Sequence, residues 1–381
     1  MINNLFIMGL AMKVRFILSG LLLASLGCAA TTYPVTITDM DNQKITLEKE
    51  PERVILQDGR DIMALALLDR EMPFKRVVAW NNLLKKQDGR SWALLSEKWP
   101  DSKTIIDMGF SDQGEINLES VLAKQPDIMI AQLRAKPALE QGGVIETLKK
   151  LNIPVIFVDY ELHPLENTAK SVNLLGTILN QESRAKEYTD YYQQQLNALQ
   201  QVTKAEKNKP TVFIEPIAGN SENCCFTHGH NGWGGLVEAV GGKNIGSELL
   251  PGSTGFISIE KIIEMKPDIY IMTGSKRTNQ NVLPFGYNVS KDEVAPAFNK
   301  LLSRATFETI EPIQKGKVFG VYHHFYNHPY NIIGMEVLAK DLYPQALQQL
   351  NPEADYHHII KSFTQIPDSP VTLSYSLQDG K

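Results

Sequence analysis

The chain has 381 residues, of which 43% are hydrophobic and 21% are charged, and this ordinary globular composition extends over too many residues for one small core. The formal net charge is −5 and no basic stripe marks the sequence, which excludes nucleic acid as an expected partner. Two folded lobes are therefore expected.

Residues 1–30 have the order of regions found in a secretory signal peptide. Lys13 and Arg15 give a basic start, Phe16–Leu26 is apolar, and Gly27–Ala30 contains small residues. The apolar stretch is shorter than the ~20 residues that a membrane-spanning helix needs. We predict export, with Met12 as a second candidate for the true start; a buried N-terminal helix is the alternative.

The three cysteines bear on processing and on redox state. Cys28 lies in a segment, SLGC, that resembles a lipobox, so the mature protein is predicted to be periplasmic, either soluble or tethered by a lipid on Cys28. Cys224 and Cys225 are adjacent. A bridge between neighbours would be strained, because their Cα atoms lie only ~3.8 Å apart, and two buried free thiols are the expectation.

Short apolar strands alternate with helical segments in both halves of the chain. The strand candidates are 53–57, 76–80 and 155–160 in the first half and 211–217 and 317–322 in the second. Near-continuous apolar strands between helices predict parallel sheets that are covered on both faces. Ligands of such sheets bind outside the carboxyl ends of the strands.

One helix-then-strand unit occurs twice. Residues 116–131 (INLESVLAKQPDIMIA) align with 257–272 (ISIEKIIEMKPDIYIM), with six identities in sixteen positions. Pro126 and Pro267 end the helix in each copy. Helix, Pro-Asp and strand are common in any α/β protein, but one copy in each half favours a duplicated, two-lobed architecture.

A long helix is predicted between the halves. Residues 182–206 lack Gly and Pro, and apolar or aromatic residues recur there every three to four positions. The predicted fold class is thus α/β, with two Rossmann-like lobes, each with a parallel sheet, joined by a single bridging helix. The lobes are expected at 31–181 and 207–381.

Candidate ligand residues follow the strands. Arginine offers a fixed fork of donors to anionic oxygens, and aromatic rings offer stacking area. The predicted ligand-binding residues are Asp58, Arg60, Trp80, Arg134, His228, His230, Trp233, Tyr322, His323, His324 and Tyr326. For the arginines an ion pair is the alternative, and for Trp80 core packing is.

Residues 321–331, VYHHFYNHPYN, hold three of the eight histidines. Imidazole and tyrosinate coordinate iron and borderline metals, so direct metal binding is considered for His228, His230, His324 and Tyr326. Side chains alternate along a strand, so only one of His323 and His324 is expected to face the ligand. His328 precedes a proline and is interpreted as a helix-entry residue.

Four segments in this order resemble a known family. Residues 35–68 are similar to its opening hairpin and first strand, GWGGLVEAVGGKNI (232–245) to its second-lobe signature, 258–272 to the unit that follows, and PYNIIGMEVLAKDLYP (329–344) to its closing helix. The chain thereby resembles the helix-bridged (class III) substrate-binding proteins of ABC importers for iron-siderophores, haem and cobalamin. The resemblance covers nearly the whole mature chain.

The resemblance implies a monomer without an intrinsic cofactor that captures a ferric-siderophore or related metal chelate between its lobes and delivers it to a membrane permease. A receptor for metal ions or haem is the first alternative. An exported hydrolase is the second, because GNSEN (219–223) follows a strand, although it departs from the nucleophile pattern by ending in Asn. We expect no enzyme activity.

Overall fold

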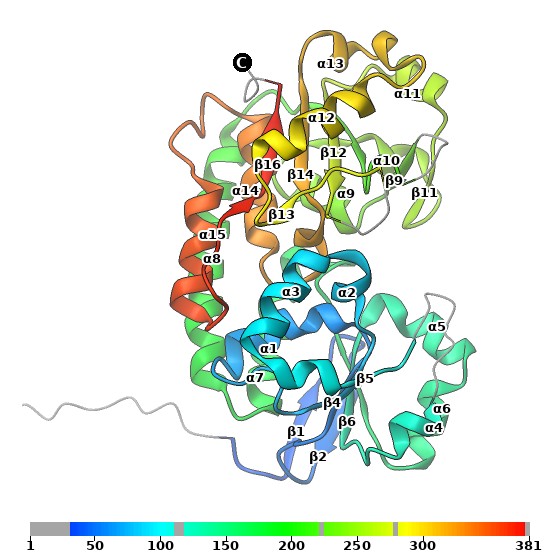
Figure 1. Ribbon diagram of the computed structural model, residues 1–381, viewed down its shortest axis with the longest axis vertical. Helices are drawn as coiled ribbons and strands as arrows, with labels where there is room; N and C mark the ends of the chain where they lie inside the picture. The colour runs from blue at the N-terminus through cyan, green and yellow to red at the C-terminus, as the bar shows by residue number, and fades with distance from the viewer. Residues whose placement is uncertain (1–30, 110–117, 221–224, 277–280, 378–381) are drawn as a thin grey trace, which may run out of the picture.

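The computed structural model describes residues 31–109, 118–220, 225–276 and 281–377. They form two α/β lobes stacked end to end, with one long helix running along the side of both (Figure 1). The predicted signal peptide with Cys28, and also Cys224, lie outside the described residues. The predicted fold class is confirmed.

The sheet of the first lobe has the strand order β5-β4-β3-β6-β7, with parallel neighbours. Its strands are β3 (Val54–Leu56), β4 (Val77–Trp80), β5 (Ile106–Asp107), β6 (Ile128–Gln132) and β7 (Val155–Val158). The strands β3, β6 and β7 are buried throughout, because helices cover both faces. An antiparallel hairpin of β1 (Val35–Thr38) and β2 (Lys44–Leu47) precedes this sheet.

The sheet of the second lobe has the order β10-β8-β12-β14-β16. Its strands are β8 (Thr211–Glu215), β10 (Lys243–Asn244), β12 (Ile269–Gly274), β14 (Val318–Tyr322) and β16 (Ser374–Ser376). This sheet is mixed, because the edge strand β16 pairs antiparallel with β14. Two small antiparallel pairs accompany it: β9 (Phe226–His228) with β11 (Thr254–Phe256), and β13 (Gly286–Tyr287) with β15 (Val371–Thr372).

Helices fill the connections between the strands (Figure 1). Those of the first lobe are α1 (Ile62–Leu68), α2 (Leu83–Gln87), α3 (Gly89–Lys98), α4 (Leu118–Leu122), α5 (Lys136–Gln141), α6 (Val144–Lys150) and α7 (Pro164–Ile178). Those of the second lobe are α9 (Gly232–Ala239), α10 (Ile245–Leu249), α11 (Ile259–Met265), α12 (Lys291–Leu302), α13 (Glu311–Gln314), α14 (Asn331–Leu342) and α15 (Pro352–Phe363). In the part of the chain that the structure describes, no helix is long and apolar enough to cross a membrane.

The bridging helix is α8 (Glu182–Ala205). Its apolar stripe is buried, and two of its tyrosines also bond to the segment that opens α14. The Tyr188 hydroxyl donates to the Pro329 carbonyl at 2.7 Å, and the Tyr192 hydroxyl bonds to the Asn331 side chain at 2.9 Å. The helix is therefore fixed to the second lobe by polar contacts as well as by packing.

The turn between α2 and α3 joins the lobes directly. The Tyr322 hydroxyl, at the end of β14, donates to the Asp88 carboxylate, and the Ser275 hydroxyl donates to the Gln87 carbonyl at 2.8 Å. Cys225 is disulfide-bonded. The expectation of two free thiols is therefore wrong for Cys225, and an oxidising compartment suits such a bond.

A buried carboxyl group in α14 makes the stability of the protein depend on pH. Burial, with a smaller effect of the Asp355 carboxylate, raises the pKa of Glu336 to about 9. In the unfolded chain a Glu titrates near about 4.3. The folded protein therefore keeps a proton that the unfolded chain releases, and the free energy of unfolding falls as pH rises between these two values.

Replacing Glu336 with Gln is expected to remove this dependence. At about pH 8 the Glu336→Gln protein should be more stable than wild type by about 1–3 kcal/mol, and at about pH 4 the two should be nearly equal. Urea denaturation at both pH values measures the difference. The exposed Glu353 at the start of α15 supplies the matched control, Glu353→Gln. An equal difference at both pH values would contradict this explanation.

Candidate functional site

The site is built on a buried ion pair at the carboxyl end of β3. Asp58 caps a short 3-10 turn, accepting from the Arg60 backbone N–H at 3.0 Å, and also accepts from Arg60 Nε at 2.8 Å. Gly59 permits this turn, because a Cβ there would lie 2.3 Å from the Asn81 carbonyl oxygen. The Arg60 side chain is only 4% exposed. Arg60 is thus enclosed by its partners, and its contact with a ligand stays a prediction.

Arg134 reaches the same carboxylate from the end of β6. Its Nη2 lies 2.8 Å from Asp58 Oδ2, and its Nε lies 3.0 Å from Glu161 Oε2, a residue that follows β7. The Arg134 side chain is 20% exposed, five times as much as that of Arg60. Of the two arginines, Arg134 is therefore the one that a solute can reach.

The two carboxyl groups of this cluster, Asp58 and Glu161, differ in how firmly they keep their negative charge. Burial alone would raise the pKa of Asp58, but the Arg60 charge and hydrogen bonds, with Arg134, bring it well below its usual value. Burial raises the pKa of Glu161, although Arg134 acts in the opposite direction. Asp58 therefore holds its charge firmly, whereas Glu161 is the carboxylate that takes up a proton more readily.

The second lobe closes over the cluster with the turn that follows β14, residues His323–Asn327. The Asn327 amide oxygen, in the orientation that satisfies both ends of the amide, accepts from the Arg60 guanidinium and, at 3.2 Å, from the Tyr326 hydroxyl. The Tyr326 ring lies 5.5 Å from the His228 ring, centroid to centroid. Arg60, Arg134, His228 and Tyr326 are thereby brought together from both lobes.

His228 is held as a neutral imidazole. Its Nδ1 accepts from the Trp233 backbone N–H at 3.1 Å, and a Cβ at Gly232, where φ is +51°, would lie 2.3 Å from that nitrogen. Burial, and then the Arg134 charge, lower the pKa of His228 to about 3. At neutral pH this ring is therefore an uncharged group beside a cation.

Two tryptophans predicted to contact ligand belong to the core. Trp80 is 1% exposed and packs edge-on against Phe74, because its side chain falls on the covered face of β4. Trp233 is fully buried, and its indole N–H donates to the His323 carbonyl at 3.1 Å. Trp233 supports the turn under Tyr326 and does not line the site.

The other second-lobe residues that the sequence predicts to bind ligand do not lie together. His230 is 77% exposed at its side chain and pairs with Glu238 at 3.1 Å, so it does not join His228. His323 bonds to the Thr273 hydroxyl at 2.7 Å. Tyr322 and His324 meet the α2–α3 turn; His324 Nε2 lies 3.4 Å from the Gln87 carbonyl oxygen. Tyr322 and His324 thus join the two lobes, whereas the contact of His323 with Thr273 lies within the second lobe.

The predicted metal ligands are therefore not assembled. His228 and Tyr326 are neighbours, whereas His230 and His324 point to other partners. Within residues 31–109, 118–220, 225–276 and 281–377, no group of three or more His, Cys, Asp or Glu side chains has the arrangement to hold a metal ion.

Sequence reasoning missed three members of the site. Glu161 and Asn327 make the contacts described above. His328 is 4% exposed, and burial, followed by the nearby Arg60 charge, lowers its pKa to about 3. Its interpretation as a mere helix-entry residue is incomplete, because it also packs beside the ion pair. The rule that ligand groups follow parallel strands would have found Glu161, three residues beyond β7.

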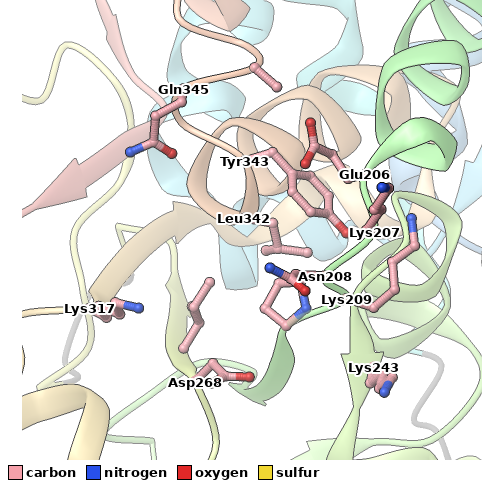
Figure 2. A pocket seen from close by; sticks show the side chains of 13 residues that line it. Glu206, Lys207, Asn208, Lys209, Lys243, Asp268, Lys317, Leu342, Tyr343 and Gln345 are labelled. Carbon is pink, nitrogen blue, oxygen red and sulfur yellow. The ribbon is translucent and has the colours of Figure 1, made fainter.

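A cavity of about 700 Å³ lies at the other edge of the second-lobe sheet (Figure 2). Residues at the amino ends of the second-lobe strands line this cavity. Its charged residues are Glu206, Lys207, Lys209, Lys243, Asp268 and Lys317. The Arg134 cluster (Asp58, Arg60, Arg134 and Glu161), in contrast, lies at the carboxyl ends of the strands, where parallel sheets present ligand-binding groups. We therefore take the Arg134 cluster, and not this cavity, as the candidate ligand-binding site.

Three known proteins are similar to this chain over half of its length or more. The molybdate-binding protein MolA of Haemophilus influenzae is 22% identical over 94% of this chain and 99% of its own length. The ferric enterobactin-binding periplasmic protein FepB of Escherichia coli is 24% identical over 54% of this chain and 62% of its own. The structure of FepB from Veillonella parvula superposes with a TM-score of 0.80 at 22% identity, covering 90% of this chain and 99% of that one.

A family model described as periplasmic binding protein matches residues 80–321, well over half of the chain. The structural neighbours share its two parallel-sheet lobes and bridging helix. The chain belongs to the periplasmic binding proteins, in the helix-bridged class that supplies substrates to ABC importers.

Proposed function

We propose that this protein captures an anionic metal chelate of the ferric-siderophore type at the Arg134 cluster and delivers it to its membrane permease. The observation that carries the proposal is the partly exposed Arg134 guanidinium, set between the lobes beside two neutral ring systems, His228 and Tyr326. Guanidinium donors suit carboxylate or aryl-oxide oxygens, and the rings provide apolar area for the organic part of a chelate.

The Glu161 carboxylate contacts Arg134 at the position where we expect an anionic oxygen of the ligand to bind. It lies 3.0 Å from Arg134 Nε, and burial raises the pKa of this carboxyl. An anion that approaches Arg134 would compete with the Glu161 carboxylate and push its pKa further upward, since like charges disfavour each other. We therefore expect ligand binding to be accompanied by movement or protonation of Glu161, with Asp58 unchanged.

A bare oxyanion is the second candidate. MolA, whose name states that it binds molybdate, matches this chain over nearly its whole length. Arg134 with the Tyr326 hydroxyl and the His228 ring would offer donors to such an anion as well. The direct metal-ion alternative loses support, because its predicted ligands lie apart; haem retains His228 and Tyr326 as axial candidates. The hydrolase alternative rested on residues 219–223, which lie largely outside the described residues.

Export and lipidation at Cys28 remain part of the proposal. The family is periplasmic, and the match to a Bacillus subtilis substrate-binding lipoprotein (22% identical over 83% of this chain) supports a lipid tether. The intact mass of the mature protein separates the two forms: a diacylglyceryl adduct on Cys28 marks the tethered form, a chain that starts just after Ala30 marks the soluble form, and a mass that retains Met1 would contradict export.

Intrinsic fluorescence titration tests the proposed ligand. Trp233 lies 6.1 Å from the Tyr326 ring, so occupancy of the site should change its emission. Ferric chelates, molybdate, cobalamin, haem and free metal salts are titrated separately. Saturable quenching by ferric chelates is expected. Saturation by molybdate, by haem or by a free metal alone would replace the proposed ligand with that one.

A further inference from the structure

The two-stranded ribbon of β9 and β11 carries an aromatic face beside the candidate site. Its register pairs Phe226 with Phe256 and His228 with Thr254. Side chains two residues apart share a face of a strand, so Phe226, His228 and Phe256 lie on one side. Ring distances agree: Phe226 lies 5.7 Å from His228 and 5.5 Å from Phe256, edge-on in both cases.

This face is continuous with the Arg134 cluster. His228, at one end, lies 5.5 Å from Tyr326, and the Arg134 charge lowers the pKa of His228 through space. The rings therefore form an unbroken series from Tyr326 through His228 and Phe226 to Phe256. Residues 226 and 228 are separated by about 6.6 Å along the strand, so the series reaches well past the volume that a small tetrahedral anion would occupy at Arg134.

The far end of the series is open to solvent. Phe256 is 63% exposed, which makes it the most exposed of the large hydrophobic side chains in the described part of the chain. Phe226 is partly buried beneath it. The ribbon lies on the side of the second lobe that faces the α5 region of the first lobe, into which the segment of Arg134 leads (Figure 1). An exposed ring next to a partly buried one presents a surface for stacking.

We infer that Phe226 and Phe256 form an aromatic shelf that stacks on a planar aryl group of the ligand while Arg134 binds its anionic oxygens. The ligand is then an anionic chelate whose metal-binding oxygens are carried on aromatic rings. This inference rests on the proposed function and narrows it. A bare oxyanion is too small to reach the shelf from Arg134, and an aliphatic chelate would gain little from the rings.

The shelf is tested by comparing two ferric complexes, one of an aryl-oxide (catecholate) chelator and one of an aliphatic hydroxamate chelator. Both are titrated into the full mature protein and its Phe256→Ala and Phe256→Tyr variants. Phe256→Ala should weaken binding of the catecholate complex by about three- to tenfold, the range of an aromatic pair. Phe256→Tyr should retain it, and hydroxamate binding should be unchanged. The exposure of Phe256 means that folding is not at risk.

The outcomes separate the shelf from the proposed function. If Arg134→Ala weakens binding of the catecholate complex and Phe256→Ala does not, the function stands and the shelf is wrong. Equal loss for both chelates in Phe256→Ala would also overturn it. If Phe256→Ala binds normally but supports less import, the ring contacts the permease and not the ligand. If wild type binds neither complex, the proposed function and the shelf fail together.

Discussion

Replacing Arg134 with alanine is expected to weaken binding of the anionic ligand by more than tenfold. A charge-assisted contact in a desolvated site costs ~2–5 kcal/mol when one partner is removed, and each ~1.4 kcal/mol is a factor of ten in Kd. The fold should persist, because Asp58 keeps its two contacts with the Arg60 side chain. Titration calorimetry or fluorescence measures the loss.

Lys136 provides a matched control for that experiment. It lies two residues further along, carries the same charge and pairs with Asp41 at 2.7 Å, away from the cluster. Lys136→Ala should bind normally. Arg134→Lys should recover only part of the affinity, since an ammonium group cannot reproduce the planar fork. Unchanged affinity in Arg134→Ala would remove this residue from the site.

Replacing Arg60 with methionine is expected to lower the free energy of unfolding by about 3–5 kcal/mol. Removing one partner of a buried ion pair leaves the other charge uncompensated, and Asp58 is 1% exposed. Arg134 stays in contact with Asp58 at 2.8 Å and limits the loss to this range. Urea denaturation of Arg60→Met and wild type measures the difference.

The pH dependence of that difference identifies its cause. The folded pKa of Asp58 lies below its unfolded value, so its contribution is present above the unfolded pKa of about 3.9 and is lost as pH falls toward the folded value. The gap between Arg60→Met and wild type should be constant at neutral pH and shrink below about pH 4. The double variant Asp58→Leu/Arg60→Met should recover most of the lost stability. A gap that stays constant into acid would assign the loss to packing.

Much of this site follows from one sequence rule. Groups that follow parallel strands meet at one edge of the sheet, and that rule placed Asp58, Arg60, Arg134 and Tyr326. It did not predict that Arg60 would be enclosed, because the enclosing amide, Asn327, comes from the other lobe. Lobe-to-lobe contacts have no local signal in the sequence.

The directions of the side chains in the histidine-rich segment could not be predicted from the sequence. Alternation of faces predicts that only one of His323 and His324 faces the ligand, but residues 323–327 form a 3-10 turn, in which period two does not hold. Both rings are buried, and each has a partner outside the candidate ligand contacts. The place of Trp80 at a strand end likewise predicts ligand contact, whereas its side chain lies on the face of β4 that packs in the core.

Native mass spectrometry of the protein purified from the periplasm of iron-limited cells identifies the bound ligand by its mass. We expect a mass increment equal to an intact metal chelate, lost when the protein is acidified and absent from the Arg134→Ala variant. An increment equal to a single metal ion, or to a bare oxyanion such as molybdate, would contradict this expectation.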